Sequence, residues 1–113
     1  MNTLAPGDDL IFQLESGFGL LRVLAVEEGV WHLLAYDDFF PDVESAEAAL
    51  ARGTPLPVRK AHMALTNRAF ERTPTAKLGN RPVTDDELAS YNEWLNGERE
   101  VSDRSALLML GIR

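Results

Sequence analysis

Residues 7–40 hold three apolar segments, and the turns that join them are short enough to force neighbouring segments into antiparallel pairs. The segments are Asp9–Glu15, Phe18–Glu27 and Val30–Tyr36, with Gly17 and Gly29 at the turns. Short glycine turns between runs of this kind indicate β-hairpins. We therefore predict a three-stranded meander that curls into a compact barrel, an architecture suited to presenting its loops and one face to a partner.

The middle segment is apolar on both faces, which predicts a central strand. Arg22 is its one interior charge. Because side chains alternate along a strand, its expected faces are Phe18, Leu20, Leu24 and Val26 on one side and Leu21, Val23 and Ala25 on the other. The third segment should likewise place Val30, His32, Leu34 and Tyr36 on one face and Trp31, Leu33 and Ala35 on the other.

Weaker signals follow the meander. Pro41 ends the third strand, and a short helix is expected from an N-cap at Asp42 to Ala51. Val58–Phe70 fits either a fourth strand or a helical turn, and the absence of helix caps favours the strand. Thr73–Pro82 contains two prolines and a glycine, and it fits a loop or an irregular edge strand.

The clearest local signal is a capping box, with Thr84 as the N-cap and Glu87 three residues later. It predicts a helix from Asp85 to about Asn96. A second helix start at Ser102-Asp103 leads into residues 106–110, which are apolar all round. Such a segment must be covered, either by the barrel or by a subunit interface, so both a monomer and a homodimer stay open.

The composition bounds the class of protein. A chain of 113 residues with 45% hydrophobic and 26% charged residues suits one globular domain. The absence of cysteine excludes disulfides and thiolate metal sites. No secretory signal and no stretch of about 18 apolar residues is visible, so we expect a cytoplasmic location and no membrane contact.

Charge divides the chain into three blocks. The net charge is -9 over residues 1–51, +6 over residues 52–81 and -4 over residues 82–113. An acidic first half repels phosphates and suits a basic partner. The alternative is that these charges only keep a small domain soluble.

The best candidate for a binding site is the segment that follows the third strand. It places two aromatic side chains among three carboxylates in a predicted loop, and its residues are Asp37, Asp38, Phe39, Phe40 and Asp42. Exposed aromatics ringed by acids are typical of a contact site for a basic protein. The alternative is that Phe39 and Phe40 fold back under the following helix.

The basic block offers a different interpretation. Phe70 lies among Arg59, Lys60, Arg68 and Arg72, an arrangement that resembles a weak site for RNA or single-stranded DNA. It makes an adaptor for nucleic acid or a ribonucleoprotein the second hypothesis, although nucleic acid is the less favoured partner. These cations equally suit a solvated edge or internal pairing with the acidic half.

Catalytic signatures are scarce. Ser16 lies in a glycine turn without the strand-to-helix context of a nucleophile elbow. His32 and His62, even with Asp37 or Asp38, match no metal-binding spacing, and adjacent aspartates on an extended segment point to opposite faces. We predict no enzyme activity, no cofactor and no metal, and we keep a small hydrolase or metal enzyme using His32 or His62 as a third hypothesis.

Three motifs resemble a family of small bacterial immunity proteins that inhibit polymorphic toxins. They are a strand opened by Gly7-Asp8, a Gly17-Phe18-Gly19 turn before an Arg22-Val23 strand, and an aliphatic strand ending in Tyr36-Asp37. The resemblance covers residues 6–72 and implies an SH3-like barrel that inhibits a toxin by binding it, without catalytic residues. The predicted fold class is therefore α+β, mainly β: one domain over 1–113, with a small antiparallel SH3-like barrel at 6–72 and a helical extension at 83–113.

Overall fold

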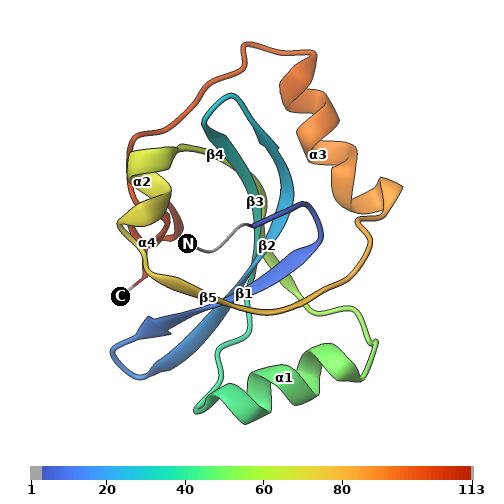
Figure 1. Ribbon diagram of the computed structural model, residues 1–113, viewed down its shortest axis with the longest axis vertical. Helices are drawn as coiled ribbons and strands as arrows, with labels where there is room; N and C mark the ends of the chain where they lie inside the picture. The colour runs from blue at the N-terminus through green and yellow to red at the C-terminus, as the bar shows by residue number, and fades with distance from the viewer. Residues whose placement is uncertain (1–3, 113) are drawn as a thin grey trace.

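A computed structural model describes residues 4–112 and shows a mainly β α+β fold. Five antiparallel strands form one curled sheet in the order β4-β3-β2-β1-β5, and four short helices surround it (Figure 1). The elements are β1 (Asp8–Leu14), β2 (Gly17–Glu27), β3 (Val30–Tyr36), α1 (Val43–Ala51), β4 (Val58–Thr66), α2 (Asn67–Glu71), β5 (Thr75–Asn80), α3 (Asp85–Leu95) and α4 (Ala106–Leu110).

The meander is confirmed. Two-residue turns join β1 to β2 and β2 to β3, so that Leu14 pairs with Gly17 and Glu27 pairs with Val30. The second turn places Glu28 and Gly29 at positive φ (47° and 78°), as tight hairpin turns require. β2 is the central strand of the sheet, as its two apolar faces predict.

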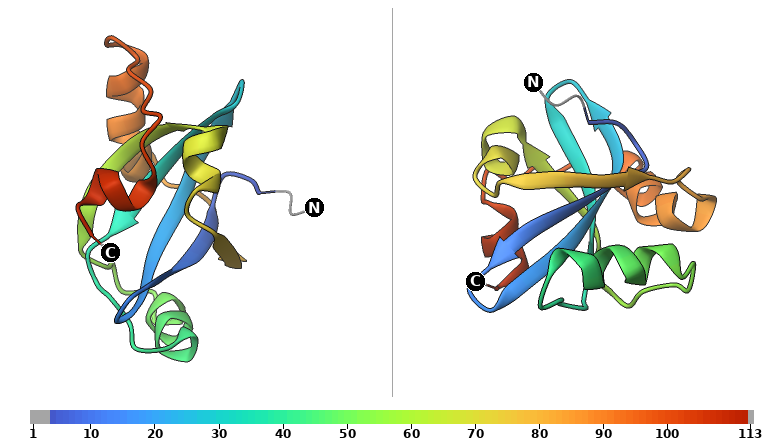
Figure 2. Two further views of the ribbon diagram at one scale, coloured as in Figure 1. Left: turned by 90° about the vertical axis from the view of Figure 1, so that its left-hand side faces the viewer. Right: turned by 60° about the horizontal axis from the view of Figure 1, so that its bottom comes forward.

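Helices cover both faces of the sheet, and each face has its own core. The α2–α4 core contains Leu10, Phe12, Leu21, Val23, Leu33, Ala35, Met63, Leu65, Ala69, Phe70, Ala106 and Leu110. The α1–α3 core contains Ile11, Leu20, Leu24, Leu34, Tyr36, Ala46 and Tyr91. The right-hand view in Figure 2 shows α2 and α4 on one side of the sheet and α1 and α3 on the other. Ile11 breaks the alternation of β1 because that strand, too, is buried on both faces.

The predicted faces of β2 are correct up to Leu24 and wrong beyond it. Val23 pairs with Leu33 and Ala25 pairs with His32, so Leu24 is an extra residue in β2. Such a β-bulge places two successive side chains on one face and reverses the alternation that follows. Ala25 therefore packs against the α1–α3 core and Val26 against the α2–α4 core.

The two ambiguous segments form three elements, β4, α2 and β5. Val58–Thr66 is the fourth strand, as favoured, and the chain then turns into α2, where Thr66 is the N-cap and accepts a hydrogen bond from the Ala69 amide. The region after α2 forms β5, an edge strand whose pairing with β1 shifts between Asp9 and Leu10. The edge-strand alternative was the correct one.

Helix α3 starts where its caps predict, but the predicted start of the last helix at Ser102-Asp103 is wrong. The N-cap of α4 is Ser105, because Ser102 instead forms a β-bridge with Leu65 of β4. The capping box of Thr84 and Glu87 is present at the start of α3. Ala106 and Leu110 of α4 are buried in the α2–α4 core, so the apolar tail packs on the sheet, whereas Leu108 faces outward with 69% of its surface exposed. Among residues 4–112, no helix combines the length and apolar character needed to cross a membrane.

Candidate functional site

Three residues of the predicted binding loop have structural partners. Asp37 Oδ1 accepts a hydrogen bond from Arg59 Nη1 at 3.0 Å. Asp42 is the N-cap of α1, and its hydrogen bonds with Ser45 lower the pKa of its carboxyl group. The Phe40 side chain packs against the α1–α3 core. The expectation that the aromatics fold back therefore holds for Phe40.

The backbone of Phe40 explains why the loop is held in place. Its N–H and C=O each form a 2.8 Å hydrogen bond with the backbone of Phe18 in β2. Gly17 allows this approach, because a Cβ there would lie 2.5 Å from the Phe40 carbonyl oxygen. The glycine turn noticed in the sequence thus anchors the start of the candidate site.

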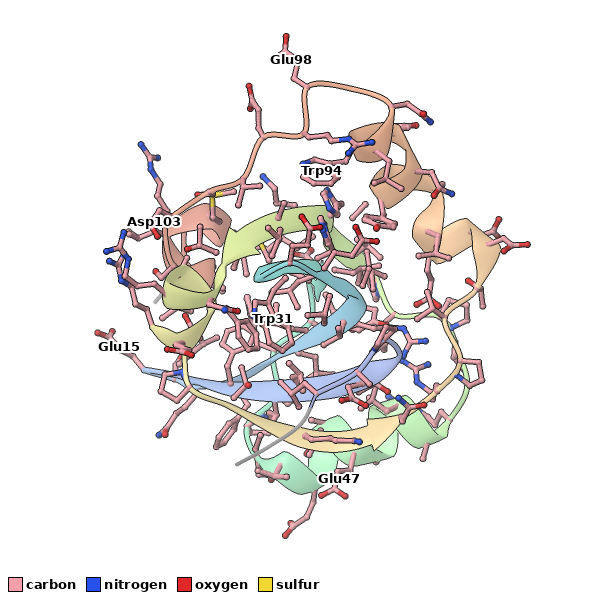
Figure 3. The ribbon with its side chains drawn as sticks, turned by 45° about the horizontal axis from the view of Figure 1, so that its top comes forward. Glu15, Trp31, Glu47, Trp94, Glu98 and Asp103 are labelled. Carbon is pink, nitrogen blue, oxygen red and sulfur yellow. The ribbon has the colours of Figure 1, made fainter. Side chains whose placement is uncertain are left out.

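Three residues of the loop and three residues of α1 make up a surface that is here called the acidic face. It consists of Asp38, Phe39, Asp42, Val43, Glu44 and Glu47. Phe39 is 46% exposed and Val43 is 37% exposed. Within residues 4–112, the carboxylates of Asp38, Glu44 and Glu47 form no ion pair and no hydrogen bond. Figure 3 shows Glu47 pointing away from the sheet.

A cleft of about 590 Å³ opens beside the acidic face at Val43. It is lined mainly by apolar side chains of β1, β2 and the segment before β5, among them Ile11, Phe12, Phe18 and Pro74. A mainly apolar cleft that shares Val43 with the acidic face can accept an apolar side chain of a partner.

The basic segment has the opposite character, because most of its cations are bound within the chain. Arg59 contacts Asp37 and donates two hydrogen bonds to the Leu110 carbonyl oxygen. Arg68 forms an ion pair with Asp103, and Arg72 donates to the Asp103 carbonyl oxygen at 3.0 Å. Of the four residues proposed for nucleic acid, only Lys60 has no such partner among the described residues. Arg68 and Arg72 therefore fasten the C-terminal segment to α2.

Two further basic residues of the segment neutralise the buried carboxylates of β1. Lys77 lies 3.1 Å from Asp8, and Arg81 Nε lies 2.7 Å from Asp9. Asp9 Oδ1 also accepts a hydrogen bond from Arg22 Nη1 at 3.1 Å. The sequence suggested pairing with the acidic half as one possibility, and the structure shows it for Arg59, Lys77 and Arg81.

The structure brings His32 and His62 together, which the sequence analysis did not predict. His32 Nδ1 lies 2.9 Å from His62 Nε2. His32 pairs with Ala64 across β3 and β4, so His62, two residues before Ala64, is its diagonal neighbour on the same face. Tyr91 and Trp94 of α3 cover the pair, with ring centroids 4.6 Å from that of His32.

The surroundings keep both imidazoles neutral. His32 is completely buried, and burial lowers its pKa, although Glu27 acts in the opposite direction. Burial, with smaller contributions from His32 and Lys60, lowers the pKa of His62 to about 4. The Tyr91 hydroxyl donates a hydrogen bond to Glu27 Oε1. Burial is the larger cause and this hydrogen bond the smaller cause that raise the pKa of Tyr91 to about 12.

The histidine pair does not form a recognisable metal centre. Within residues 4–112, no cluster of three or more histidine, aspartate or glutamate side chains has an arrangement that could hold an ion. The second imidazole nitrogen of His32 is buried without a hydrogen-bond partner in this part of the chain and lies among aromatic rings. The arrangement suits a packed pair of neutral imidazoles.

The sequence analysis also did not recognise the role of Arg22. This side chain is 1% exposed and donates to Asp9, to Glu87 and to the carbonyl oxygens of Gly7, Arg81 and Pro82. A signal for part of this network was present, because a two-residue turn at residues 15–16 places Asp9 opposite Arg22.

Comparison with family models, with curated proteins and with solved structures finds no match. The resemblance of residues 6–72 to immunity proteins therefore stays an expectation from the sequence.

Proposed function

We propose that this protein is a non-catalytic binding domain that contacts a basic protein through its acidic face. The proposal rests on one contrast: the acidic side chains of this face are unpaired, whereas most basic side chains of the basic segment are paired. Asp38, Glu44 and Glu47 have no partner in residues 4–112, whereas most cations of the basic segment are bound within the chain. Unpaired carboxylates attract a cationic surface, and this favours the acidic face over the basic segment as the contact site.

In this proposal, the two apolar residues of the acidic face, Phe39 and Val43, supply most of the binding affinity. Phe39 and Val43 are both exposed, and Val43 lines the cleft. Aromatic anchors at the centre of a contact carry most of the binding energy in protein interfaces. The surrounding carboxylates accelerate association and select a positively charged partner.

The fold supports a more specific version of the proposal. The strand order β4-β3-β2-β1-β5, with a short helix between β4 and β5, is compatible with an SH3-like barrel. Residues 6–72 also resemble small bacterial immunity proteins in their strand motifs. We infer that the partner is a toxin whose basic surface the domain blocks, and that α3 and α4 form a helical extension of the barrel.

The test is binding to the product of the neighbouring gene. The purified protein should bind that product, and the double variant Asp38→Ala with Phe39→Ala should weaken binding by about thirtyfold, the usual loss for a central aromatic anchor. Leu108→Ala is the matched control, because Leu108 is more exposed than Phe39 but lies on α4. Affinity should also fall as salt is raised.

Two results would overturn the proposal. One is unchanged binding by the double variant, which would move the contact away from the acidic face. The other is absence of protein binding together with salt-sensitive binding to RNA or single-stranded DNA that Lys60→Ala weakens, which would favour the nucleic-acid adaptor instead.

A further inference from the structure

Helix α3 is attached to the sheet by two different kinds of contact, one at each end. At its N-terminal end, Glu87 Oε2 accepts a hydrogen bond from the buried Arg22 at 2.6 Å. At its C-terminal end, Tyr91 and Trp94 pack over His32 and His62. The proposed partner contact uses neither attachment, so the histidine pair needs a separate explanation.

The pair is arranged for one shared proton. At 2.9 Å, one imidazole donates and the other accepts, an arrangement that two neutral rings satisfy. A second proton at this contact would direct two N–H groups at each other. A single positive charge is also disfavoured, because the rings lie under Tyr91 and Trp94 and burial disfavours the charged form.

The charged groups around the pair come from every element packed against it. Glu27 of β2 is the neighbouring acid, and its carboxylate is already engaged by the Tyr91 hydroxyl of α3. Lys60 of β4 adds a repulsive positive charge. A cleft of about 470 Å³ beside His62 also contains Glu100 and Arg104, and it gives water access to that ring. Protons can therefore reach the pair, but within residues 4–112 no carboxylate forms a hydrogen bond or an ion pair with either imidazole.

We propose that the His32–His62 pair is an acid-sensitive latch that holds the C-terminal half of α3 against the sheet. Protonation of the pair favours the undocked helix, in which both imidazoles are hydrated. The N-terminal end of α3 stays attached: burial acts to raise the pKa of Glu87, but its hydrogen bonds with Arg22 outweigh that effect and lower the pKa. Acid thus opens one end of the helix and exposes Tyr91 and Trp94.

The direction of the effect follows from the two states. In the docked state the pKa of His62 is about 4, below the ordinary value of 6.5 that an undocked, hydrated imidazole regains. The latch is at full strength above the undocked pKa, and it weakens as the pH falls toward the docked pKa. With one proton taken up on opening, these two pKa values make the opening equilibrium rise about 20-fold between pH 6 and pH 4.5.

Amide hydrogen exchange on the full chain tests the latch. After correction for intrinsic rates, amides of residues 91–95 should open about 20-fold more at pH 4.5 than at pH 6, while amides of residues 20–24 in β2 change much less. His62→Gln keeps a polar side chain at this position without a titrating group. Only His32 can then take up a proton on opening, so the pH dependence of opening at residues 91–95 should be smaller than in the wild type. Trp94 fluorescence in a Trp31→Phe background should report the same transition.

Three outcomes would overturn the latch. The first is an identical pH dependence in the wild type and in His62→Gln. The second is loss of protection in β2 and α3 together, because that is global unfolding rather than release of one helix end. The third needs only the wild type: if both histidines titrate at or above 6.5 by NMR in the folded protein, protonation does not favour undocking.

Discussion

Replacing Arg22 with methionine should strongly destabilise the fold. The guanidinium joins β1, β2, the segment before α3 and α3 itself, since it contacts Asp9, Glu87 and the carbonyl oxygens of Gly7, Arg81 and Pro82. Methionine retains much of the apolar stem and removes every one of these donors. The substitution therefore tests the polar network with little change in packing volume.

The magnitude follows from what is left behind. Asp9 keeps Arg81 at 2.7 Å, so one carboxylate stays paired, whereas Glu87 loses its only ion-pair partner within residues 4–112. Removing one member of a buried ion pair costs about 3–5 kcal/mol, and the orphaned carbonyl oxygens oppose any recovery. We expect a loss of about 4 kcal/mol from a total stability of about 6–17 kcal/mol for a chain of 113 residues.

Urea denaturation followed by circular dichroism at pH 7 measures this loss. With a slope of about 2 kcal/mol per molar urea, the midpoint should fall by about 2 M. Arg68→Met is the matched control, because the side chains of Arg68 and Asp103 are 73% and 46% exposed and an exposed pair contributes about 0–1 kcal/mol. Equal losses in the two variants, or a loss below about 1 kcal/mol for Arg22→Met, would refute the reasoning.

Two further substitutions test local features of the fold. Gly19→Ala should destabilise by about 2 kcal/mol, because the new Cβ would lie 2.4 Å from Cζ of the buried Phe12; a wild-type thermal midpoint would contradict this. Thr84→Ala removes the side-chain cap of α3 and should cost about 1 kcal/mol in urea denaturation, while Thr84→Ser should retain most of the stability. An equal loss in the alanine and serine variants would show that the hydroxyl is not the stabilising group.

Signals within a few residues predicted most of the elements. The short turns specified the β1–β2–β3 meander, and the capping box specified where α3 begins. The same local logic failed where the chain departs from regular geometry. The bulge at Leu24 reversed the faces of Ala25 and Val26, because one extra residue changes which face every later side chain occupies.

The candidate site divides in the same way. The cap at Asp42 is a local feature, and the sequence indicated it correctly. The exposure of Phe39 and the burial of Phe40 depend on how the loop pairs with Phe18, more than twenty positions earlier in the chain. The convergence of His32 and His62 depends on a β3–β4 pairing whose register shifts twice, so no spacing between the two residues could predict it.

For this protein the sequence alone determined the three strands of the meander, their two hairpin turns, the N-caps of α1 and α3 and the distribution of charge along the chain. Only the tertiary structure decided which charges are neutralised, since Arg68 meets Asp103, and Arg81 meets Asp9, through contacts between distant segments. The physical reason is the separation along the chain of the residues that set each feature. Turns and caps are set by neighbouring residues, whereas an ion pair or a buried imidazole pair requires the whole sheet to be assembled with its bulges in place.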